Sequence, residues 1–171
     1  MPRYVAFLRG VSPLNCKMPE LKRCFEGVGF SNVKTLLSSG NVVFDTVLQT
    51  DAQVELLAEQ GMEQGLDRVF RTIARSVTSL EALLATDPYT EHGIPVEAKR
   101  VVSFLREVRE PKVVLPLAAD NASVFCLRGR EAYTAYLPSE KGPVFMKLIE
   151  DAFGTEVTTR TWDTIRKCAA A

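Results

Sequence analysis

Residues 3–10 read RYVAFLRG, a short apolar run that ends at Arg9-Gly10 and predicts the first strand of the fold. A continuous apolar run of this length is typical of a strand in the middle of a sheet. Apolar residues then recur at every third or fourth position over residues 18–28, which predicts an amphipathic helix. Pro19 suits the first turn of that helix, and Gly29 suits its end.

The residues that follow complete a β-α-β-β-α-β order. Strands are predicted over residues 33–37 and 42–44, joined by a tight turn at Gly40-Asn41. Residues 50–53 have the spacing of a capping box, which predicts the start of a second helix. The alternation over residues 68–74 predicts a fourth strand. This is the order of a ferredoxin-like subdomain, in which both helices cover one face of a four-stranded antiparallel sheet.

The rest of the chain predicts a smaller α+β part. A capping box at residues 78–81 predicts a short helix, residues 89–95 have the composition of a linker, and residues 110–121 are irregular with room for a short helix. The regular segments expected here are strands at residues 100–105, 123–127 and 132–137 and helices from Pro143 to Gly154 and from Trp162 onward. The expected fold class is α+β, with a ferredoxin-like subdomain at residues 1–76, a helix and linker at 77–96, and a C-terminal α+β subdomain at 97–171 packed with the first.

The composition argues against several classes of protein. Lys plus Arg and Asp plus Glu number 21 each, so the net charge gives no general attraction to nucleic acid or to a membrane surface. No apolar stretch approaches the ~20 residues of a membrane span and no secretory signal is visible, so we expect a cytoplasmic protein. The four cysteines are scattered far from the single histidine, His92, so no metal site is expected. No cofactor motif is present, and the sequence does not decide whether the chain is an enzyme.

Two segments of the first half are candidates for binding an anion. An arginine at a strand end, as in Arg9-Gly10, can hold a carboxylate or phosphate, and the glycine lets a ligand approach the backbone. Ser38-Ser39-Gly40-Asn41 can form a nest of hydroxyl and N–H groups. Both segments also have a purely structural interpretation, as a surface arginine with a loop glycine and as ordinary hairpin chemistry.

A third candidate segment, residues 158–164, lies near the C-terminus and reads TTRTWDT. It precedes a predicted helix, whose free N–H groups favour anions, while Arg160 offers a charged donor and Trp162 a stacking face. In the structural alternative a threonine caps the helix, Asp163 complements its dipole and Trp162 belongs to the core. A lowered thiol pKa at Cys16 beside Lys17 is a further possibility, although no base is placed to activate it.

Taken together, these segments resemble a known family. Residues 3–11 (RYVAFLRGV), 33–44 (VKTLLSSGNVVF) and 158–167 (TTRTWDTIRK) are similar, in this order and nearly from end to end, to the domain of unknown function 1697 (DUF1697) family of uncharacterised bacterial proteins. The resemblance implies an α+β fold with a ferredoxin-like half and no settled activity.

The resemblance also adds candidate binding residues and shows where this chain departs from the usual pattern of the family. Family members usually have a longer, glycine-rich loop after the Arg-Gly pair. Here Ser12 or Asn15 takes the place of its asparagine, and Lys17 takes the place of its lysine. Asp163 stands where members usually have an asparagine, so a ligand at that position would have to be a donor or a cation. The candidate ligand-binding residues are therefore Arg9, Gly10, Asn15, Lys17, Ser39, Gly40, Asn41, Thr159, Arg160, Trp162 and Asp163.

The sequence favours one function and leaves two others open. The first is binding of a small anionic or nucleotide-like molecule in a cleft between the subdomains, where the three segments would converge. The second is a single-stranded nucleic-acid-binding module that uses Tyr4 and Phe44 on the sheet with Arg9, Lys34, Arg68 and Arg71 nearby. The third is a protein-interaction module with the second half as a dimer surface. The oligomeric state is not predicted.

Overall fold

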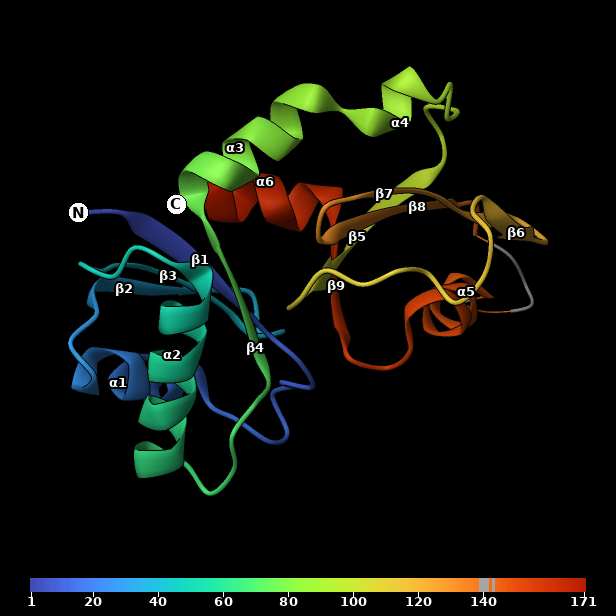
Figure 1. The fold of residues 1–171 in the computed structure, drawn as a ribbon. Helices are drawn as coiled ribbons and strands as arrows, with labels where there is room; N and C mark the ends of the chain where they lie inside the picture. Colours follow the sequence, from blue (N-terminus) through green and yellow to red (C-terminus); the bar gives the residue numbers. More distant parts are fainter. Residues whose placement is uncertain (139–141, 143) are drawn as a thin grey trace. The chain divides into compact units, whose positions relative to one another are not determined.

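The computed structural model describes residues 1–138, 142 and 144–171, and the chain divides into two compact units (Figure 1). Unit 1 comprises Met1–Leu84 with Arg166–Ala171, and unit 2 comprises Ala85–Ile165. Each unit has its own antiparallel sheet. The predicted α+β class is therefore confirmed, whereas the breaks predicted at residues 76 and 96 stay predictions.

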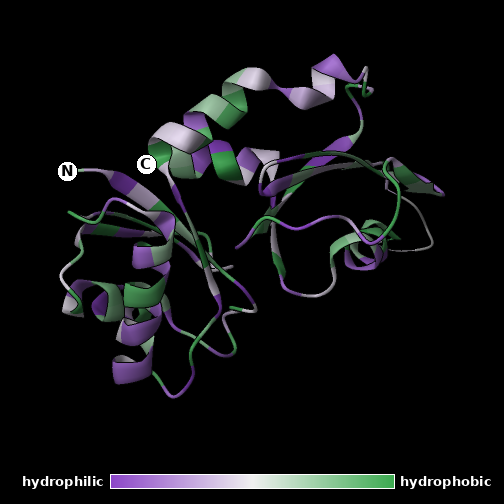
Figure 2. Ribbon diagram, in the orientation of Figure 1, coloured by the Kyte–Doolittle hydropathy of each residue, from purple (hydrophilic) through white to green (hydrophobic). Residues whose placement is uncertain are grey.

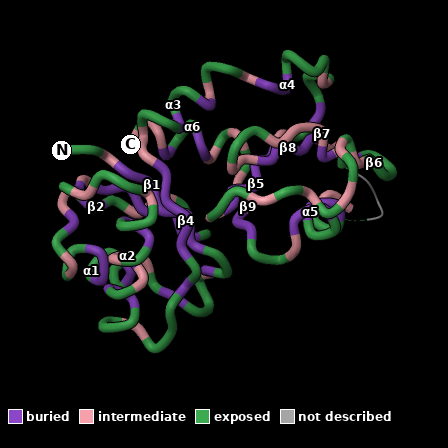
Figure 3. Tube along the Cα trace, viewed as in Figure 1, coloured by how far each residue is buried: buried purple, intermediate pink, exposed green. Residues whose placement is uncertain are grey.

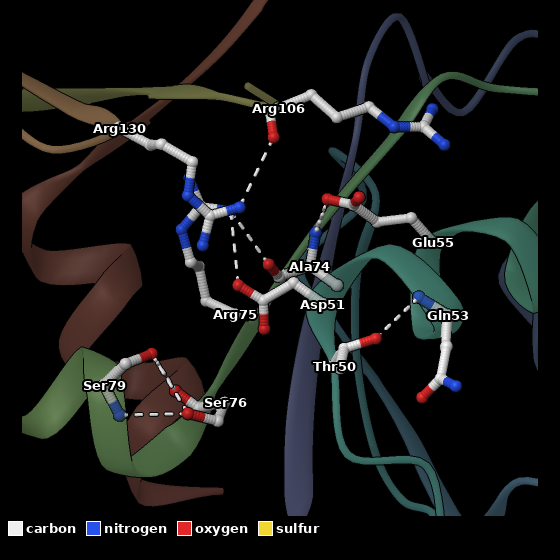
Figure 4. A network of polar contacts seen from close by, with 10 residues as sticks. All are labelled: Thr50, Asp51, Gln53, Glu55, Ala74, Arg75, Ser76, Ser79, Arg106 and Arg130. Carbon is white, nitrogen blue, oxygen red and sulfur yellow. Dashed lines mark hydrogen bonds and ion pairs between the residues drawn. The ribbon is translucent and has the colours of Figure 1, made fainter. Parts of the chain in front are cut away.

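Unit 1 contains the predicted ferredoxin-like order. Its sheet has the strand order β2-β3-β1-β4, with every neighbouring pair antiparallel. Its elements are β1 (Arg3–Leu8), α1 (Met18–Gly27), β2 (Ser31–Leu36), β3 (Asn41–Asp45), α2 (Asp51–Gly65), β4 (Thr72–Ser76) and most of α3 (Val77–Thr86). The predicted helix start is confirmed, because the Thr50 side chain caps α2 by accepting a hydrogen bond from the Gln53 N–H over 3.2 Å (Figure 4). The reciprocal bond of a capping box, from the Thr50 N–H to the Gln53 side chain, is not formed between these two described residues.

Both α1 and α2 carry hydrophobic as well as hydrophilic residues (Figure 2), and they pack on one face of this sheet. Their apolar residues join the inward residues of β1 and β3 in one core, which includes Tyr4, Phe25, Phe44 and Met62. The two helices approach closely because α2 has a glycine at the contact. A Cβ on Gly61 would lie only 2.6 Å from the Cys24 carbonyl oxygen. Buried residues also run along β1 and β4 (Figure 3).

The outer edge of β4 is covered by side chains. Two carboxylates of α2, one turn apart, accept hydrogen bonds from β4, Glu59 from the Thr72 N–H at 3.1 Å and Glu55 from the Ala74 N–H at 2.9 Å. Arg75 donates to the Ala74 carbonyl at 2.9 Å (Figure 4). These bonds occupy backbone groups that an edge strand would otherwise offer to another chain.

Unit 1 also includes residues from the far end of the sequence. Residues 166–171, the second part of α6 (Trp162–Ala170) and the residue that follows it, belong to this unit. The Arg3 guanidinium donates to the Ala171 carbonyl at 3.0 Å and pairs with Asp45 at 2.8 Å. Arg3 thereby ties the first strand both to β3 and to the C-terminal residues.

Unit 2 is built on a five-stranded sheet of order β6-β7-β8-β5-β9. Its elements are α4 (Pro88–Glu91), β5 (Lys99–Leu105), β6 (Leu117–Ala119), β7 (Ala122–Arg128), β8 (Glu131–Tyr136), α5 (Val144–Phe153) and β9 (Val157–Thr161). Helix α5 contributes to a core with β5, β7, β8 and β9. The hydroxyl of the fully buried Tyr89 donates to the Val101 carbonyl at 2.6 Å, which fixes α4 to β5.

Several sequence predictions for unit 2 are wrong. Residues 88–91 form a helix rather than part of a linker, and Tyr89 is in the core. The segment 110–121 holds the short strand β6 and no helix. Residues 157–161 form the strand β9, which pairs with β5, instead of only leading into the last helix. The hairpin β7–β8 and the end of α5 at Gly154 are confirmed, whereas Pro143 lies outside the described residues.

Two boundaries in unit 1 also differ from the sequence prediction. The fourth strand begins at Thr72 rather than at residue 68, and the Arg68 guanidinium instead lies 4.7 Å from the centre of the Phe70 ring. Helix α3 begins at Val77, because Ser76 rather than Thr78 accepts the capping hydrogen bond, from the Ser79 N–H at 3.1 Å (Figure 4). None of the helices in the described ranges is long and apolar enough to cross a membrane, and the cytoplasmic location stays a prediction.

Candidate anion-binding site

The first two predicted segments meet at one end of the unit 1 sheet. The Leu8 N–H donates to the Gly40 carbonyl at 2.8 Å, and the Arg9 N–H donates to the Arg71 carbonyl at 2.9 Å. The exit of β1, the β2–β3 turn and the entry to β4 are thus joined by backbone hydrogen bonds. We call the loop 9–17, the turn 37–40 and Arg71 the loop end of unit 1.

Asn15 holds the loop 9–17 in shape. Its side-chain amide donates to the Gly10 carbonyl at 2.8 Å, and its side-chain oxygen accepts from the Ser12 N–H at 2.9 Å. The Asn15 N–H also donates to the Ser12 carbonyl, which closes a tight turn. Gly10 has a φ of +82°, a conformation that suits glycine. Asn15 therefore acts on its own loop through both ends of its amide.

Asn41 does the same for the β2–β3 turn from a fully buried position. Its amide donates to the Leu36 carbonyl and to the Ser39 hydroxyl, both at 3.1 Å. Gly40 has a φ of +87°, and a Cβ there would lie 2.9 Å from the Val11 Cβ, so only glycine fits without a shift. The structural interpretation accounts for both residues, because Asn41 holds the turn by hydrogen bonds and Gly40 lets it pack against Val11 of the loop 9–17.

The loop end carries three cations, Arg9, Lys17 and Arg71. All three are exposed, and none of their side chains forms a hydrogen bond or ion pair with the described residues. At the opposite end of the sheet, Arg3 is paired with Asp45. The loop end therefore combines a hydrogen-bonded backbone with cations that form no ion pair with the described residues.

Cys16 offers no nucleophile at the loop end. Burial is the main cause that raises the pKa of its thiol, and the neighbouring Cys24 and Glu20 raise it further, while Arg68 acts weakly in the other direction. The thiol is therefore protonated at neutral pH, and the possibility that Lys17 lowers its pKa is wrong. Within residues 1–138, 142 and 144–171, no group of three or more His, Cys, Asp or Glu side chains could hold a metal ion.

The third predicted segment, residues 158–164, lies in unit 2 and includes the start of α6. The Thr161 hydroxyl accepts from the Thr164 N–H at 3.1 Å and so caps α6, with Asp163 in the first turn. The Trp162 ring packs edge-on against Tyr89, with ring centroids 5.1 Å apart. These contacts agree with the structural alternative for Thr161 and Trp162.

Two further residues of this segment are also engaged in unit 2. The Thr159 and Ser103 hydroxyls are 2.8 Å apart, and the Arg160 guanidinium donates to the Thr159 carbonyl at 3.0 Å. The prediction that this segment shares one cleft with Arg9 and Asn41 stays a prediction.

The aromatic residues proposed for nucleic-acid stacking are not accessible. Tyr4 and Phe44 belong to the core beneath α1 and α2, where Phe44 stacks on Phe30 at a centroid distance of 4.1 Å. The nucleic-acid alternative needs exposed aromatic faces, so Tyr4 and Phe44 cannot serve as stacking residues in it.

Two cavities lie away from the predicted residues. One, of about 470 Å³, is lined by α1 and α2, including Glu20, Arg23, Cys24 and Gly65. Another, of about 310 Å³, is lined in unit 2 by Pro95, Tyr136 and their neighbours. No residue predicted from the sequence to bind a ligand lines either cavity.

Three residues at the loop end are absent from the candidate anion-binding residues, although Arg71 appears in the nucleic-acid alternative. Arg71 was expected inside the fourth strand, but it precedes that strand and binds the backbone of Arg9. Leu14 and Leu37 are apolar yet exposed, and a sequence pattern gives no sign of this because apolar residues are normally assigned to the core.

The fold and loop end define the chain as a two-unit α+β protein with a ferredoxin-like unit and a basic loop end. It belongs to the family described as "Protein of unknown function (DUF1697)", whose model matches residues 1–133. Among solved structures it is similar to "conserved bacterial protein SP0830 from Streptococcus pneumoniae", with a TM-score of 0.75 and 18% identity over 99% of this chain and 97% of that one. At this identity the likeness shows the fold alone. No curated protein matches the chain.

Proposed function

We propose that the chain binds a small anionic molecule, through a phosphate or a carboxylate, at the loop end of unit 1. The observation that carries the proposal is the group of three cations, Arg9, Lys17 and Arg71, that lack partners in the described part of the chain. Charge-assisted hydrogen bonds from arginine and lysine are the usual means of holding such anions. A nucleotide belongs to this class through its phosphates.

The fixed backbone beneath the cations supports the same proposal. Asn15 and Asn41 hold the two loops, so little conformational freedom would be lost when an anion binds. Gly10 adds a backbone that has no side chain and no atom within 4 Å of its missing Cβ. A ligand can therefore approach the chain closely at that residue. The proposal rests on unit 1 alone and includes no catalysed reaction.

A thermal-shift screen with inorganic phosphate, nucleotides, sugar phosphates and metabolite carboxylates tests the proposal. An anion present at a hundred times its Kd stabilises the protein by about 2.7 kcal/mol. Arg9→Ala and Lys17→Ala should each weaken the best anion about tenfold or more, since each removes a charged hydrogen bond. Lys34→Ala, which removes an exposed cation from β2, is the matched control.

Two results would contradict the proposal. One is that no anion of the screen stabilises the protein. The other is that Arg9→Ala and Lys17→Ala leave the affinity unchanged, or reduce it no more than Lys34→Ala does, which would leave only a general effect of charge.

A further inference from the structure

Two leucines are exposed at the loop end of unit 1, which also carries the unpaired cations. Leu14 in the loop 9–17 has 97% of its surface exposed, and Leu37 in the turn 37–40 has 52%. An exposed leucine is unremarkable by itself, but two of them at one loop end with cations that form no ion pair with the described part of the chain give this surface both apolar and positive parts. The chemistry of this surface limits what it can bind.

Leu14 is held at the loop end by hydrogen bonds on both sides of it. It lies in the turn that the Asn15 N–H closes on the Ser12 carbonyl, and its own N–H donates to the Ser12 hydroxyl at 3.3 Å. Asn15 is bound to the Gly10 carbonyl, one residue from Arg9. The exposed Leu14 side chain therefore projects from a hydrogen-bonded turn that is tied to Gly10, the residue after Arg9.

Leu37 is placed beside the same loop by the β2–β3 turn. Leu36 pairs with Asn41, so Leu37 and Gly40 face each other across the turn, and Gly40 packs against Val11. Leu37 has a φ of +58°, a conformation that costs energy for a leucine and suits glycine or asparagine. Neither the backbone nor burial in the protein core explains a leucine at this position.

We infer that the anion bound at the loop end carries an apolar group. The negative group contacts the cations, and an alkyl or aryl group lies against Leu14 and Leu37. The ligand class is thus an alkyl or aryl phosphate or carboxylate rather than a fully polar anion. This inference rests on the proposed function and narrows its ligand.

Isothermal titration with matched probes separates charge from apolar contact. The probes are inorganic phosphate, hexyl phosphate, acetate, hexanoate and hexanol. Burial of about two methylene groups on the leucines is enough to make the alkyl anion roughly tenfold tighter than its short counterpart. The phosphate and carboxylate pairs show which anionic group is preferred, and hexanol measures binding without charge.

Variants test whether the leucines cause the gain. Leu14→Ser and Leu37→Asn should each reduce the ratio of alkyl-anion to short-anion affinity toward one, and leave the short anion unchanged. Asparagine accepts the positive φ at residue 37, so the turn is kept. Val47→Ser is the control, because Val47 is 73% exposed beyond β3, at the opposite sheet end, and should leave the ratio unaltered.

The outcomes distinguish this inference from the proposed function. If neither short nor alkyl anions bind, the proposed function fails and the inference falls with it. If short anions bind and the alkyl chain adds nothing, or adds the same in Leu14→Ser and Leu37→Asn, the inference alone is overturned. Hexanol binding as tightly as hexyl phosphate would also overturn it. So would binding to phosphatidylglycerol vesicles that hexyl phosphate monomers do not displace, because the partner would then be a membrane surface.

Discussion

The loop end of unit 1 and the segment 158–164 of unit 2 have similar polar residues but different surroundings. In unit 2, Arg160 donates to a neighbouring carbonyl, Thr161 caps a helix and Trp162 packs on Tyr89. In unit 1, two asparagines hold the loops while Arg9 and Lys17 have no partners among the described residues. The difference teaches that an arginine beside a strand end is a candidate for binding only when its neighbours leave it unsatisfied.

The largest expected effect comes from filling the contact between the two loops. Gly40→Ala combines a positive φ with an overlap on Val11 and should lower the free energy of unfolding by about 3 kcal/mol. Gly10→Ala has nearly the same φ but nothing within 4 Å of the added carbon, so it should cost only about 1 kcal/mol. Urea unfolding of both variants measures the difference. Equal losses would mean that the turn does not pack on the loop as described.

Loss of the buried amide should have the next largest effect. Asn41→Ala leaves the Leu36 carbonyl without this donor and should lower the free energy of unfolding by about 2 kcal/mol. Asn15→Ala removes bonds at an exposed site, where water can replace them, and should lower it by about 1 kcal/mol or less. Equilibrium denaturation gives both values. A larger loss for Asn15 than for Asn41 would reverse this assignment of which loop is the better anchored.

A smaller effect is expected at the helix cap in unit 2. Thr161→Ala removes the acceptor for the Thr164 N–H and should cost about 1 kcal/mol of stability. Thr161→Ser keeps the hydroxyl and should restore most of it. Thermal unfolding followed by circular dichroism compares the three proteins. A Thr161→Ala variant as stable as the parent protein would show that this cap contributes nothing.

The smallest effect on stability is expected at the unpaired arginine. Arg9→Ala removes no hydrogen bond or ion pair of the described structure, so the free energy of unfolding should change by less than about 0.5 kcal/mol. The same variant should lose affinity for the anion of the proposed site. Denaturation of the ligand-free protein is the measurement. A clear loss of stability would give Arg9 a structural role and place it with Arg160.

The sequence predicted unit 1 better than unit 2 for a physical reason. In unit 1 the core residues follow the periods of their helices and strands, and the Gly40-Asn41 turn has recognisable chemistry. In unit 2 the strand β9 reads Val-Thr-Thr-Arg-Thr and has no apolar alternation, so only its pairing with β5 reveals it. The four-residue helix α4 is likewise held by the burial of Tyr89 rather than by a local pattern.

For the candidate site, the sequence predicted where residues lie in the fold but not whether their side chains are paired or exposed. Arg9, Gly40 and Asn41 lie at the strand end and turn where the sequence places them, and their role in binding stays a prediction. Whether an arginine has a partner, or a leucine such as Leu14 is exposed, depends on residues distant in sequence. The sequence alone therefore does not predict whether an arginine is paired or a leucine is exposed.

The bond between Arg3 and the Ala171 carbonyl has a consequence for how the protein is made. Because residues 166–171 belong to unit 1, all of unit 2 is translated before unit 1 is complete. During synthesis the ribosome adds the whole of unit 2 after the first 84 residues and before the last six residues of unit 1. Domains otherwise commonly fold in the order of their synthesis. A chaperone acting on the nascent chain would therefore meet unit 1 before Arg3 can bond to the Ala171 carbonyl.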